Sequence, residues 1–372
     1  MKVLLVATVQ SHICQFHKPL AEILHENGCV IHVAAKDNLS EKNGLKLDFA
    51  DKVYDVPFSR SPKSKDNIGA YKQLKKIIDE EQYDIVHCNT PMGGIVARLA
   101  ARRARKHGTK VFYTAHGFHF YKGAPKKNWL VFYPIEKLFS RFTDKLITIT
   151  AEDYKLASEK FHCDTVRIHG VGVDEKRYFP VDNDEKKELR LKMGFGEEQK
   201  IILCIGELLP NKNQQMAIHM MTEIVKQYPD AKLLIAGNGP EEKNLRDLID
   251  SLSLNGNVIM LGYVTNLQEY QHIADVDVSC SKREGLPLNI VEAMLSGTPV
   301  VATYNRGHRE LITDTKDGFL VDVDDMQKMA EEVIKLLQDI AFCSEISRNA
   351  VEKGTEYCAS SVKSELKRVY GF

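Results

Sequence analysis

The chain has 372 residues, 43% of them hydrophobic and 27% charged, and its 51 Lys/Arg balance its 51 Asp/Glu. This length and composition are typical of a soluble globular protein with two domains. No apolar run approaches the roughly 20 residues that a membrane-spanning helix needs, and the run Met1–Val6 leads to no signal-peptide cleavage site. Eight scattered cysteines without a CxxC pair predict free thiols in a reducing cytosol.

The charge is unevenly distributed along the chain. Residues 1–180 carry a net charge of +9 and the remainder −9, and residues 85–135 contain nine Lys/Arg and no acid. One predicted helix carries Arg98, Arg102, Arg103, Arg105 and Lys106. These side chains form either an ordinary solvated helix face or a basic surface for an anionic membrane or a lipid diphosphate. Nucleic acid is a poorer candidate partner, because the pI is near 7.2 and no recognition motif is present.

Apolar runs rich in β-branched residues alternate with segments of helical periodicity, which predicts an α/β protein with two open parallel sheets. We place the domain boundary near Phe179-Pro180, giving an N-terminal domain at 1–178, a second domain at 179–352 and a C-terminal helix at 353–372. The predicted strands are 2–8, 29–35, 52–56, 84–88, 110–115, 145–149, 165–169, 200–206, 231–236, 257–261, 276–280, 299–303 and 318–321.

The segment Glu284-Gly-Leu-Pro-Leu-Asn-Ile-Val-Glu292 follows the strand 276–280, and a helix is predicted to begin near Pro287. A loop that opens a helix aims free backbone N–H groups at an anion, and the helix dipole favours negative charge there. Glu292 lies about one turn into the helix, where it can accept from a ribose, and Glu284 lies where a sugar could be held. The segment therefore indicates a nucleotide-sugar site. The alternative is that the two glutamates are eight positions apart by chance and that Glu292 is a solvated helix residue.

Three further segments lie in or just after predicted strands: Gly206-Glu-Leu-Leu-Pro-Asn-Lys212-Asn, Ala236-Gly237-Asn238-Gly239-Pro240 and Val258-Ile-Met-Leu-Gly262-Tyr263-Val264. In this order, over essentially the full length, they resemble glycosyltransferase family 4, retaining enzymes of the GT-B fold. The resemblance implies two Rossmann-like domains whose parallel sheets face each other across a cleft, with a C-terminal helix crossing back to the first domain.

The resemblance also implies roles for residues of the second domain. Lys212 is expected to contact the diphosphate, and Glu284 to bind the hydroxyls of the transferred sugar. Glu207 stands where many relatives carry an arginine; either Arg283 or Lys282 replaces that cation, or Lys212 and backbone amides suffice. The expected donor-binding residues are Lys212, Gly206, Gly262, Tyr263, Gly285, Leu286, Pro287 and Glu292.

In the first domain, His116 follows the strand 110–115 and is similar to the family's histidine that faces the donor sugar. It is expected to hydrogen-bond a sugar hydroxyl or the developing charge, and a proton-transfer role would need a pKa near working pH. The alternatives are that His116 caps a loop, or that His116 and His119 bind a metal. Ser11, His12 and His119 are candidates for the acceptor side, although Thr8–Ile13 lacks the glycine pair of many relatives.

Asp275-Val-Asp277 imitates a metal-binding DxD motif, but it begins a predicted strand, so it is interpreted as structural and one carboxylate is expected to face solvent. No metal site and no cofactor are predicted. The stretch after His116 combines basic and aromatic residues and is either a membrane anchor or a helix packed on the core: Lys122, Lys126, Lys127, Trp129, Leu130, Phe132, Tyr133 and Phe139.

We therefore expect a retaining glycosyltransferase that moves a sugar, a hexose or an N-acetylhexosamine, from a UDP-sugar to a saccharide, with an undecaprenyl-diphosphate-linked acceptor as first choice. It resembles bacterial capsule and exopolysaccharide enzymes, and is expected in the cytoplasm, peripherally on the inner leaflet of the cell membrane. Two rivals stay open: a UDP-sugar epimerase of the same fold, and a non-catalytic binding module of a polysaccharide assembly complex. A dinucleotide dehydrogenase is disfavoured because no GxGxxG follows the first strand.

Overall fold

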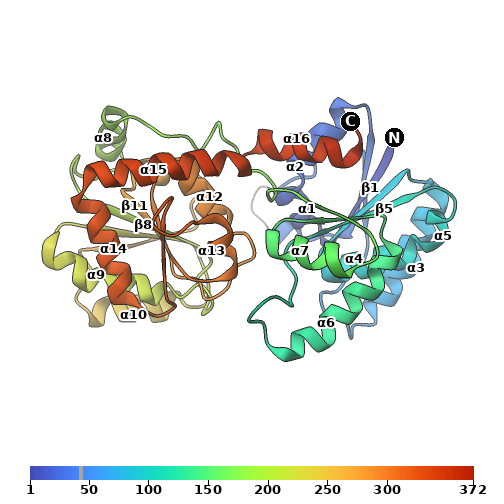
Figure 1. Ribbon diagram of the computed structural model, residues 1–372, viewed down its shortest axis with the longest axis horizontal. Helices are drawn as coiled ribbons and strands as arrows, with labels where there is room; N and C mark the ends of the chain where they lie inside the picture. Colours follow the sequence, from blue (N-terminus) through green and yellow to red (C-terminus); the bar gives the residue numbers. More distant parts are fainter. Residues whose placement is uncertain (42–44) are drawn as a thin grey trace. The chain divides into compact units, whose positions relative to one another are not determined.

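The structure is a computed structural model that describes residues 1–41 and 45–372 (Figure 1). The chain forms two compact units: the first unit comprises Met1–Gly172 and Ala359–Phe372, and the second unit comprises Val173–Cys358. These borders differ from the predicted 178/179 and 352/353. The reason is that Val173 pairs with Cys358 as an isolated bridge, and both residues pack in one hydrophobic cluster of the second unit.

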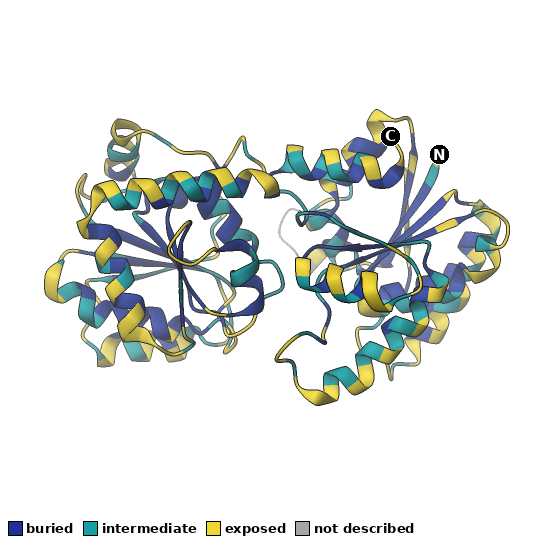
Figure 2. Ribbon diagram, in the orientation of Figure 1, coloured by how far each residue is buried: buried dark blue, intermediate teal, exposed yellow. Residues whose placement is uncertain are grey.

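The first unit contains a parallel sheet in the strand order β3-β2-β1-β4-β5-β6-β7. Helices cover the sheet, so its central strands are buried on both faces (Figure 2). Accordingly, β1 contains the unbroken apolar run Val3–Ala7. The strands are β1 Lys2–Val9, β2 Val30–Lys36, β3 Lys52–Asp55, β4 Ile85–Asn89, β5 Lys110–Ala115, β6 Lys145–Thr148 and β7 Asp164–Arg167. The α-helices are α1 Gln10–Phe16, α2 Lys18–Glu26, α3 Asp66–Glu81, α4 Pro91–Ala100, α5 Arg102–Arg105, α6 Lys126–Phe139, α7 Ala151–Lys160 and α16 Ala359–Tyr370.

The second unit contains a parallel sheet in the order β10-β9-β8-β11-β12-β13. Its strands are β8 Ile201–Ile205, β9 Lys232–Ala236, β10 Val258–Gly262, β11 Val276–Ser279, β12 Val300–Thr303 and β13 Phe319–Val321. Every strand predicted from the sequence is present, with ends shifted by no more than two residues. The α-helices are α8 Asn183–Lys192, α9 Gln214–Gln227, α10 Glu242–Ser251, α11 Leu267–Ile273, α12 Leu288–Leu295, α13 Arg306–Leu311, α14 Met326–Gln338 and α15 Ile340–Gly354.

The predicted C-terminal helix is α16, which packs on α2 of the first unit. Lys367 Nζ lies 3.0 Å from a carboxylate oxygen of Glu26, and Lys363 forms a second ion pair with Glu22. At the end of the helix, the Tyr370 hydroxyl lies 2.6 Å from Nδ1 of the buried His87. The last helix of the chain is thus part of the first unit.

The prediction that one helix carries all five basic side chains is wrong for Arg98. Arg98 lies on α4, apart from the short α5 that carries Arg102, Arg103 and Arg105, and it is only 1% exposed. Its Nη2 donates to Glu136 Oε2 at 2.9 Å, and its guanidinium stacks 4.1 Å above the Tyr113 ring. Arg105 pairs with Asp144. The compensating acids therefore come from just beyond residue 135, and the basic surface is smaller than the sequence suggests.

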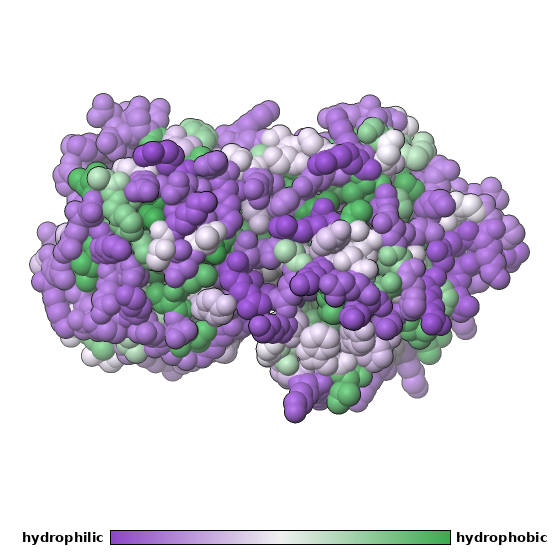
Figure 3. All heavy atoms as spheres, viewed as in Figure 1, coloured by the Kyte–Doolittle hydropathy of each residue, from purple (hydrophilic) through white to green (hydrophobic). Residues whose placement is uncertain are grey.

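The helix α6 packs on the core of the first unit and leaves part of its apolar surface exposed. Trp129, Phe132 and Tyr133 pack against the core of the first unit, whereas Leu130 is 78% exposed and Leu138 also faces outward. At the lower edge of the first unit, where Figure 1 labels α6, Figure 3 shows hydrophobic side chains among hydrophilic ones. None of the helices within residues 1–41 and 45–372 combines the length and apolar character needed to cross a bilayer.

Candidate active site

The predicted donor-binding residues meet at one edge of the second sheet. The strands β10, β8 and β11 end at this edge, because parallel strands point the same way. Gly206 follows β8, Gly262 ends β10 with Tyr263 exposed beyond it, and Glu284 lies on the loop after β11. Open parallel sheets bind ligands at the carboxyl ends of their strands, so this edge is the candidate donor site.

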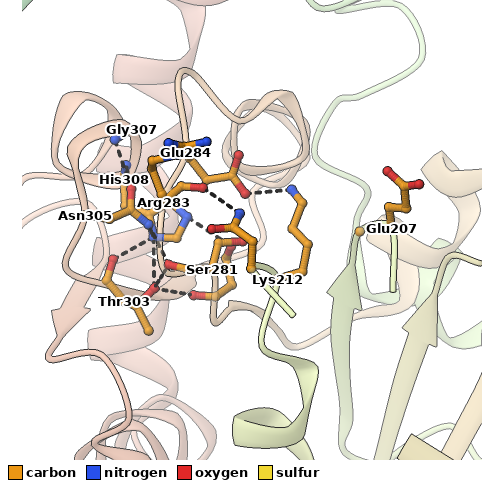
Figure 4. Close-up of polar contacts among 12 residues, drawn as sticks. Glu207, Lys212, Ser281, Arg283, Glu284, Thr303, Asn305, Gly307 and His308 are labelled. Atoms are coloured by element: carbon orange, nitrogen blue, oxygen red, sulfur yellow. Dashed lines mark hydrogen bonds and ion pairs between the residues drawn. The ribbon is translucent and has the colours of Figure 1, made fainter. Parts of the chain in front are cut away.

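Lys212 and Glu284 form an ion pair between the loops after β8 and β11 (Figure 4). Lys212 Nζ donates to Glu284 Oε1 at 2.6 Å, and the two side chains are 23% and 14% exposed. The loops are joined further, since Asn211 Nδ2 donates to the Arg283 carbonyl at 2.9 Å and the Lys282 N–H to the Asn211 carbonyl at 2.8 Å. The pair holds a cation and a carboxylate ready beside the start of α12.

The helix α12 begins at Leu288, as predicted, and Pro287 before it is extended with φ −75° and ψ 114°. No side chain at the N-cap accepts from the first turn. The first backbone N–H groups of α12 are thus available to an anion, and the helix dipole adds to the attraction. Gly285 and Leu286 complete this loop and are half-buried, while Pro287 is buried.

Glu292 is not a solvated helix residue. Its carboxylate is half-buried and accepts a hydrogen bond from the buried Tyr178. Burial raises the pKa of Glu292 to about 7, and the Tyr178 hydrogen bond and the nearby Arg177 charge only partly oppose this shift. The carboxylate therefore titrates near neutral pH.

Glu207 is exposed and lies apart from the Lys212–Glu284 pair in Figure 4. Of the two candidate replacement cations, Lys282 lies 4.0 Å from Asp324 and Arg283 has an exposed side chain. Both sit on the loop that leads to α12, so either can supply positive charge at this edge.

Two glycines let the turn after β9 approach the loop after β8. A Cβ at Gly237, whose φ is +149°, would lie 2.0 Å from the Gly206 carbonyl oxygen. A Cβ at Gly239 would lie 2.4 Å from the Leu208 carbonyl oxygen. The backbone approach explains why this turn needs glycine at both positions.

Sequence reasoning missed a buried polar network behind Glu284. Asn305 caps α13 by accepting from the Gly307 and His308 N–H groups at 2.9 and 3.1 Å, and its amide donates to the Ser281 carbonyl at 2.7 Å. Thr303 donates to the same carbonyl at 2.6 Å (Figure 4). Burial lowers the pKa of His308 to about 4, so the ring is neutral. The sequence signal that could have revealed this network was Asn305, just after the predicted strand 299–303, because Asn is a preferred N-cap residue.

In the first unit, His116 follows β5 and lies beside residues carried by β4 and α1. Its Nε2 is 3.3 Å from His12 Nε2 and 3.3 Å from Asn89 Oδ1. Burial lowers the pKa of His116 to about 4, so in this arrangement the ring lacks the pKa near working pH that a proton-transfer role would need. The ring is therefore neutral at pH 7, with one nitrogen that donates a hydrogen bond and one that accepts.

The three acceptor-side candidates line one cavity of about 610 Å³ in the first unit. The Ser11 hydroxyl is buried and accepts from Asn38 at 2.9 Å, whereas His119 is exposed with its ring stacked 4.7 Å from Phe132. The apolar wall was not predicted, because its residues come from several segments of the chain: Phe16, Met92, Ile95, Phe118, Phe120, Val131, Phe132 and Ile135.

Neither carboxylate of the DxD-like segment faces solvent freely, so that expectation is wrong. Asp275 forms ion pairs with Lys186 at 3.0 Å and Arg190 at 2.8 Å. Asp277 is fully buried and accepts from Gln271 at 2.9 Å. Asp277 lies within β11, whose sheet is covered on both faces, and Asp275 directly precedes this strand. Both carboxylates are thus held by contacts within the second unit.

Residues 185–353 match the family described as Glycosyl transferases group 1, and residues 2–150 match the family described as Glycosyl transferase 4-like. EpsD of Bacillus subtilis (strain 168), named as a glycosyltransferase, is 40% identical over 371 residues, which cover 99% of this chain and 96% of that protein. The Escherichia coli UDP-Gal:alpha-D-GlcNAc-diphosphoundecaprenol alpha-1,3-galactosyltransferase is 29% identical over 296 residues, covering 77% of this chain and 74% of that protein.

Solved structures show the same fold. HepE of Anabaena, in complex with UDP and glucose, has a TM-score of 0.77 at 20% identity, with 100% of this chain and 99% of that chain covered. Sucrose-phosphate synthase of Thermosynechococcus elongatus has a TM-score of 0.79 at 18% identity, with 100% and 98% covered. The chain therefore belongs to glycosyltransferase family 4, the group 1 glycosyl transferases, and has the GT-B fold with two Rossmann-like domains.

Proposed function

We propose that this glycosyltransferase moves a sugar from a UDP-sugar to a saccharide carried on a lipid diphosphate, undecaprenyl diphosphate being the first choice. The transfer retains the anomeric configuration and serves bacterial capsule or exopolysaccharide synthesis. The observation that carries the proposal is the arrangement of Lys212, Glu284 and Glu292 around the uncapped start of α12. This arrangement places a cation, backbone N–H donors and two carboxylates that can accept hydrogen bonds from sugar hydroxyls at one edge of the sheet.

In this proposal the donor diphosphate lies at the N-terminus of α12 and draws Lys212 away from Glu284. Glu284 is then free to accept from hydroxyls of the transferred sugar, while Glu292 accepts from the ribose. Lys212 and the α12 amides stabilise the charge that develops on the departing diphosphate. These groups supply the positive charge that a metal would otherwise bring, so we propose a metal-independent transfer.

His116 is proposed to hydrogen-bond the transferred sugar as a neutral imidazole. Its lowered pKa leaves proton transfer to another group, and the leaving phosphate oxygen is the simplest acceptor of the proton from the incoming hydroxyl. This front-side route requires no carboxylate nucleophile.

The lipid acceptor is supported by the cavity of the first unit, which combines an apolar wall with Arg60 at its lining. An apolar chain can pack on the wall, and an arginine suits a diphosphate. The E. coli relative, by its name, acts on a diphosphoundecaprenol-linked sugar. The exposed Leu130 and the lysines near the start of α6 support peripheral binding to an anionic inner leaflet.

The test is calorimetric titration of UDP, GDP, ADP and NAD into the wild type and Glu292→Ala. We expect UDP alone to bind, with weaker binding in Glu292→Ala and unchanged binding in Glu223→Ala, whose carboxylate pairs with Lys226 on α9. Absence of binding by every nucleotide would refute the donor site. UDP-sugars are then screened with and without a lipid-linked acceptor, because conversion of donor alone would indicate an epimerase.

A further inference from the structure

Three histidine rings gather at the carboxyl edge of the first sheet. His12 lies on α1, His17 stands between α1 and α2, and His116 follows β5. One ring nitrogen of each lies within 4.8 Å of the other two, and within residues 1–41 and 45–372 this is the one such group of potential metal ligands. His119, which the sequence suggested as a metal partner of His116, does not belong to it.

The spacing suits a tetrahedral metal ion. His12 Nε2 and His116 Nε2 lie 3.3 Å apart. Two nitrogens bound to tetrahedral zinc at its usual bond length are about 3.4 Å apart. These two ligands therefore stand at the required separation without rearrangement.

His17 gives a second, independent indication. Its ring is only 4% exposed, and its Nε2 has no hydrogen-bond partner although Asn89 hydrogen-bonds the ring. A buried polar nitrogen without a partner is costly and calls for a ligand. His87 lies beside His17, but both of its ring nitrogens have hydrogen-bond partners: they contact Tyr370 at 2.6 Å and Thr114 at 2.7 Å.

We propose that His12, His17 and His116 bind one zinc-type transition-metal ion, with an open fourth position, and that the bound ion inhibits sugar transfer. Three imidazoles are a suitable ligand set for zinc. The ion would take the lone pair of His116 that the sugar otherwise uses. The inhibition rests on the proposed function of His116, whereas the binding does not.

The surroundings favour reversible rather than permanent occupancy. All three ligands are imidazoles, which bind metals in their neutral form. No carboxylate joins the group, and the positive charge of Arg60 acts on His12. A site with neutral ligands and a nearby cation holds its metal less tightly than one with thiolates or carboxylates.

The test uses Co²⁺ as a spectroscopic probe on chelator-treated, dialysed full-length protein. We expect one equivalent of Co²⁺ to give the visible absorption of a tetrahedral nitrogen-ligated ion, and Zn²⁺ to displace it. His17→Gln removes a direct ligand and should weaken binding by more than the roughly 10- to 100-fold that loss of an outer-shell partner costs. His119→Gln is the matched control, since it removes an imidazole of the same cavity from outside the group and should bind as the wild type.

A second variant tests the site in case His17→Gln does not fold. His12→Gln changes a less buried ligand, and circular dichroism verifies that each variant is folded. No band with excess Co²⁺ on the wild type would overturn the site. So would sulfur-to-metal charge-transfer bands that persist in both variants, because they would assign the ion to a cysteine such as Cys14.

Activity decides the second half of the proposal. Zn²⁺ should lower sugar transfer by the wild type, a chelator should restore it, and folded His17→Gln should resist Zn²⁺. Full transfer with the Co²⁺ band present would overturn the inhibition and uphold the site. If no donor supports transfer, the proposed function fails, and the Co²⁺ spectrum still decides the site.

Discussion

Lys212 and Glu284 are paired at 2.6 Å although 72 positions separate them in the chain. The pair joins the loop after β8 to the loop that opens α12, and each side chain is mostly shielded from water. It fixes a cation and a carboxylate at the candidate donor site before any donor binds.

Replacing Lys212 by Met should lower kcat for transfer by about 100-fold, which is the scale of losing one electrostatic contact to a charged transition state. It also leaves Glu284 without its cation. Lys226→Met on α9 is the control, because Lys226 pairs only with the neighbouring Glu223 among the ion pairs of the described residues. Adding Glu284→Gln to Lys212→Met should recover thermal stability without recovering activity. Wild-type kcat in Lys212→Met would contradict the assignment.

The affinity for UDP should rise as the pH is raised from about 6 to 8. The pKa of Glu292 is raised to about 7, and the ionised carboxylate is the better acceptor for ribose hydroxyls. Titrations of the wild type and Glu292→Gln across this range check the effect. The variant should show weaker and pH-independent binding; an identical slope in both proteins would assign the titration to another group.

Glu292 should also make stability depend on pH. Its pKa in the folded state lies above its ordinary value of 4.5, so the folded protein holds the proton longer than the unfolded chain. The contribution is fully present below about pH 4.5 and is lost as the pH rises through 7, amounting to at most about 3 kcal/mol. Urea unfolding at pH 5 and pH 8 should show a smaller difference for Glu292→Gln than for the wild type.

His116→Asn should reduce kcat by about 10- to 100-fold, on the scale of a lost hydrogen bond to the reacting sugar. Because burial lowers the pKa of His116 to about 4, the wild-type pH–rate profile should contain no limb near pH 6.5 that the substitution removes. Such a limb, absent in His116→Asn, would show that the ring exchanges protons at working pH.

Arg98→Met should destabilise the first unit by about 3–5 kcal/mol, because it leaves the buried Glu136 carboxylate without its partner. The double variant Arg98→Met with Glu136→Met should be more stable than Arg98→Met alone. Urea unfolding measures both. A single variant as stable as the wild type would mean that Glu136 is solvated or protonated.

Lys122→Glu combined with Lys126→Glu should lower binding to anionic vesicles, and Leu130→Ser should lower it further by removing an exposed apolar side chain. Lys226→Glu with Lys243→Glu in the second unit is the charge-matched control. Sedimentation with vesicles measures the effect. Equal binding by the wild type and all three variants would refute a membrane role for α6.

The strands and the donor loop could be predicted because their signals are local. Apolar runs bounded by turn residues mark each strand, and Glu284-Gly-Leu-Pro carries the chemistry of a helix start within a few positions. The pairing of Arg98 with Glu136 and of Tyr178 with Glu292 could not be predicted, since both depend on tertiary packing. The group of His12, His17 and His116 could not be predicted for the same reason. The lowered pKa of His116 could not be predicted either, because it follows from burial.

The path of the chain has a consequence for how this protein is made. The helix α16 belongs to the first unit but is synthesised after the whole second unit. While the ribosome works through residues 173–358, the buried His87 lacks the Tyr370 hydroxyl, and Glu22 and Glu26 of α2 lack their lysines. The first unit therefore stays incomplete until α16 has been synthesised. A truncation before Ala359 would damage the half of the protein that lies farthest from it in sequence.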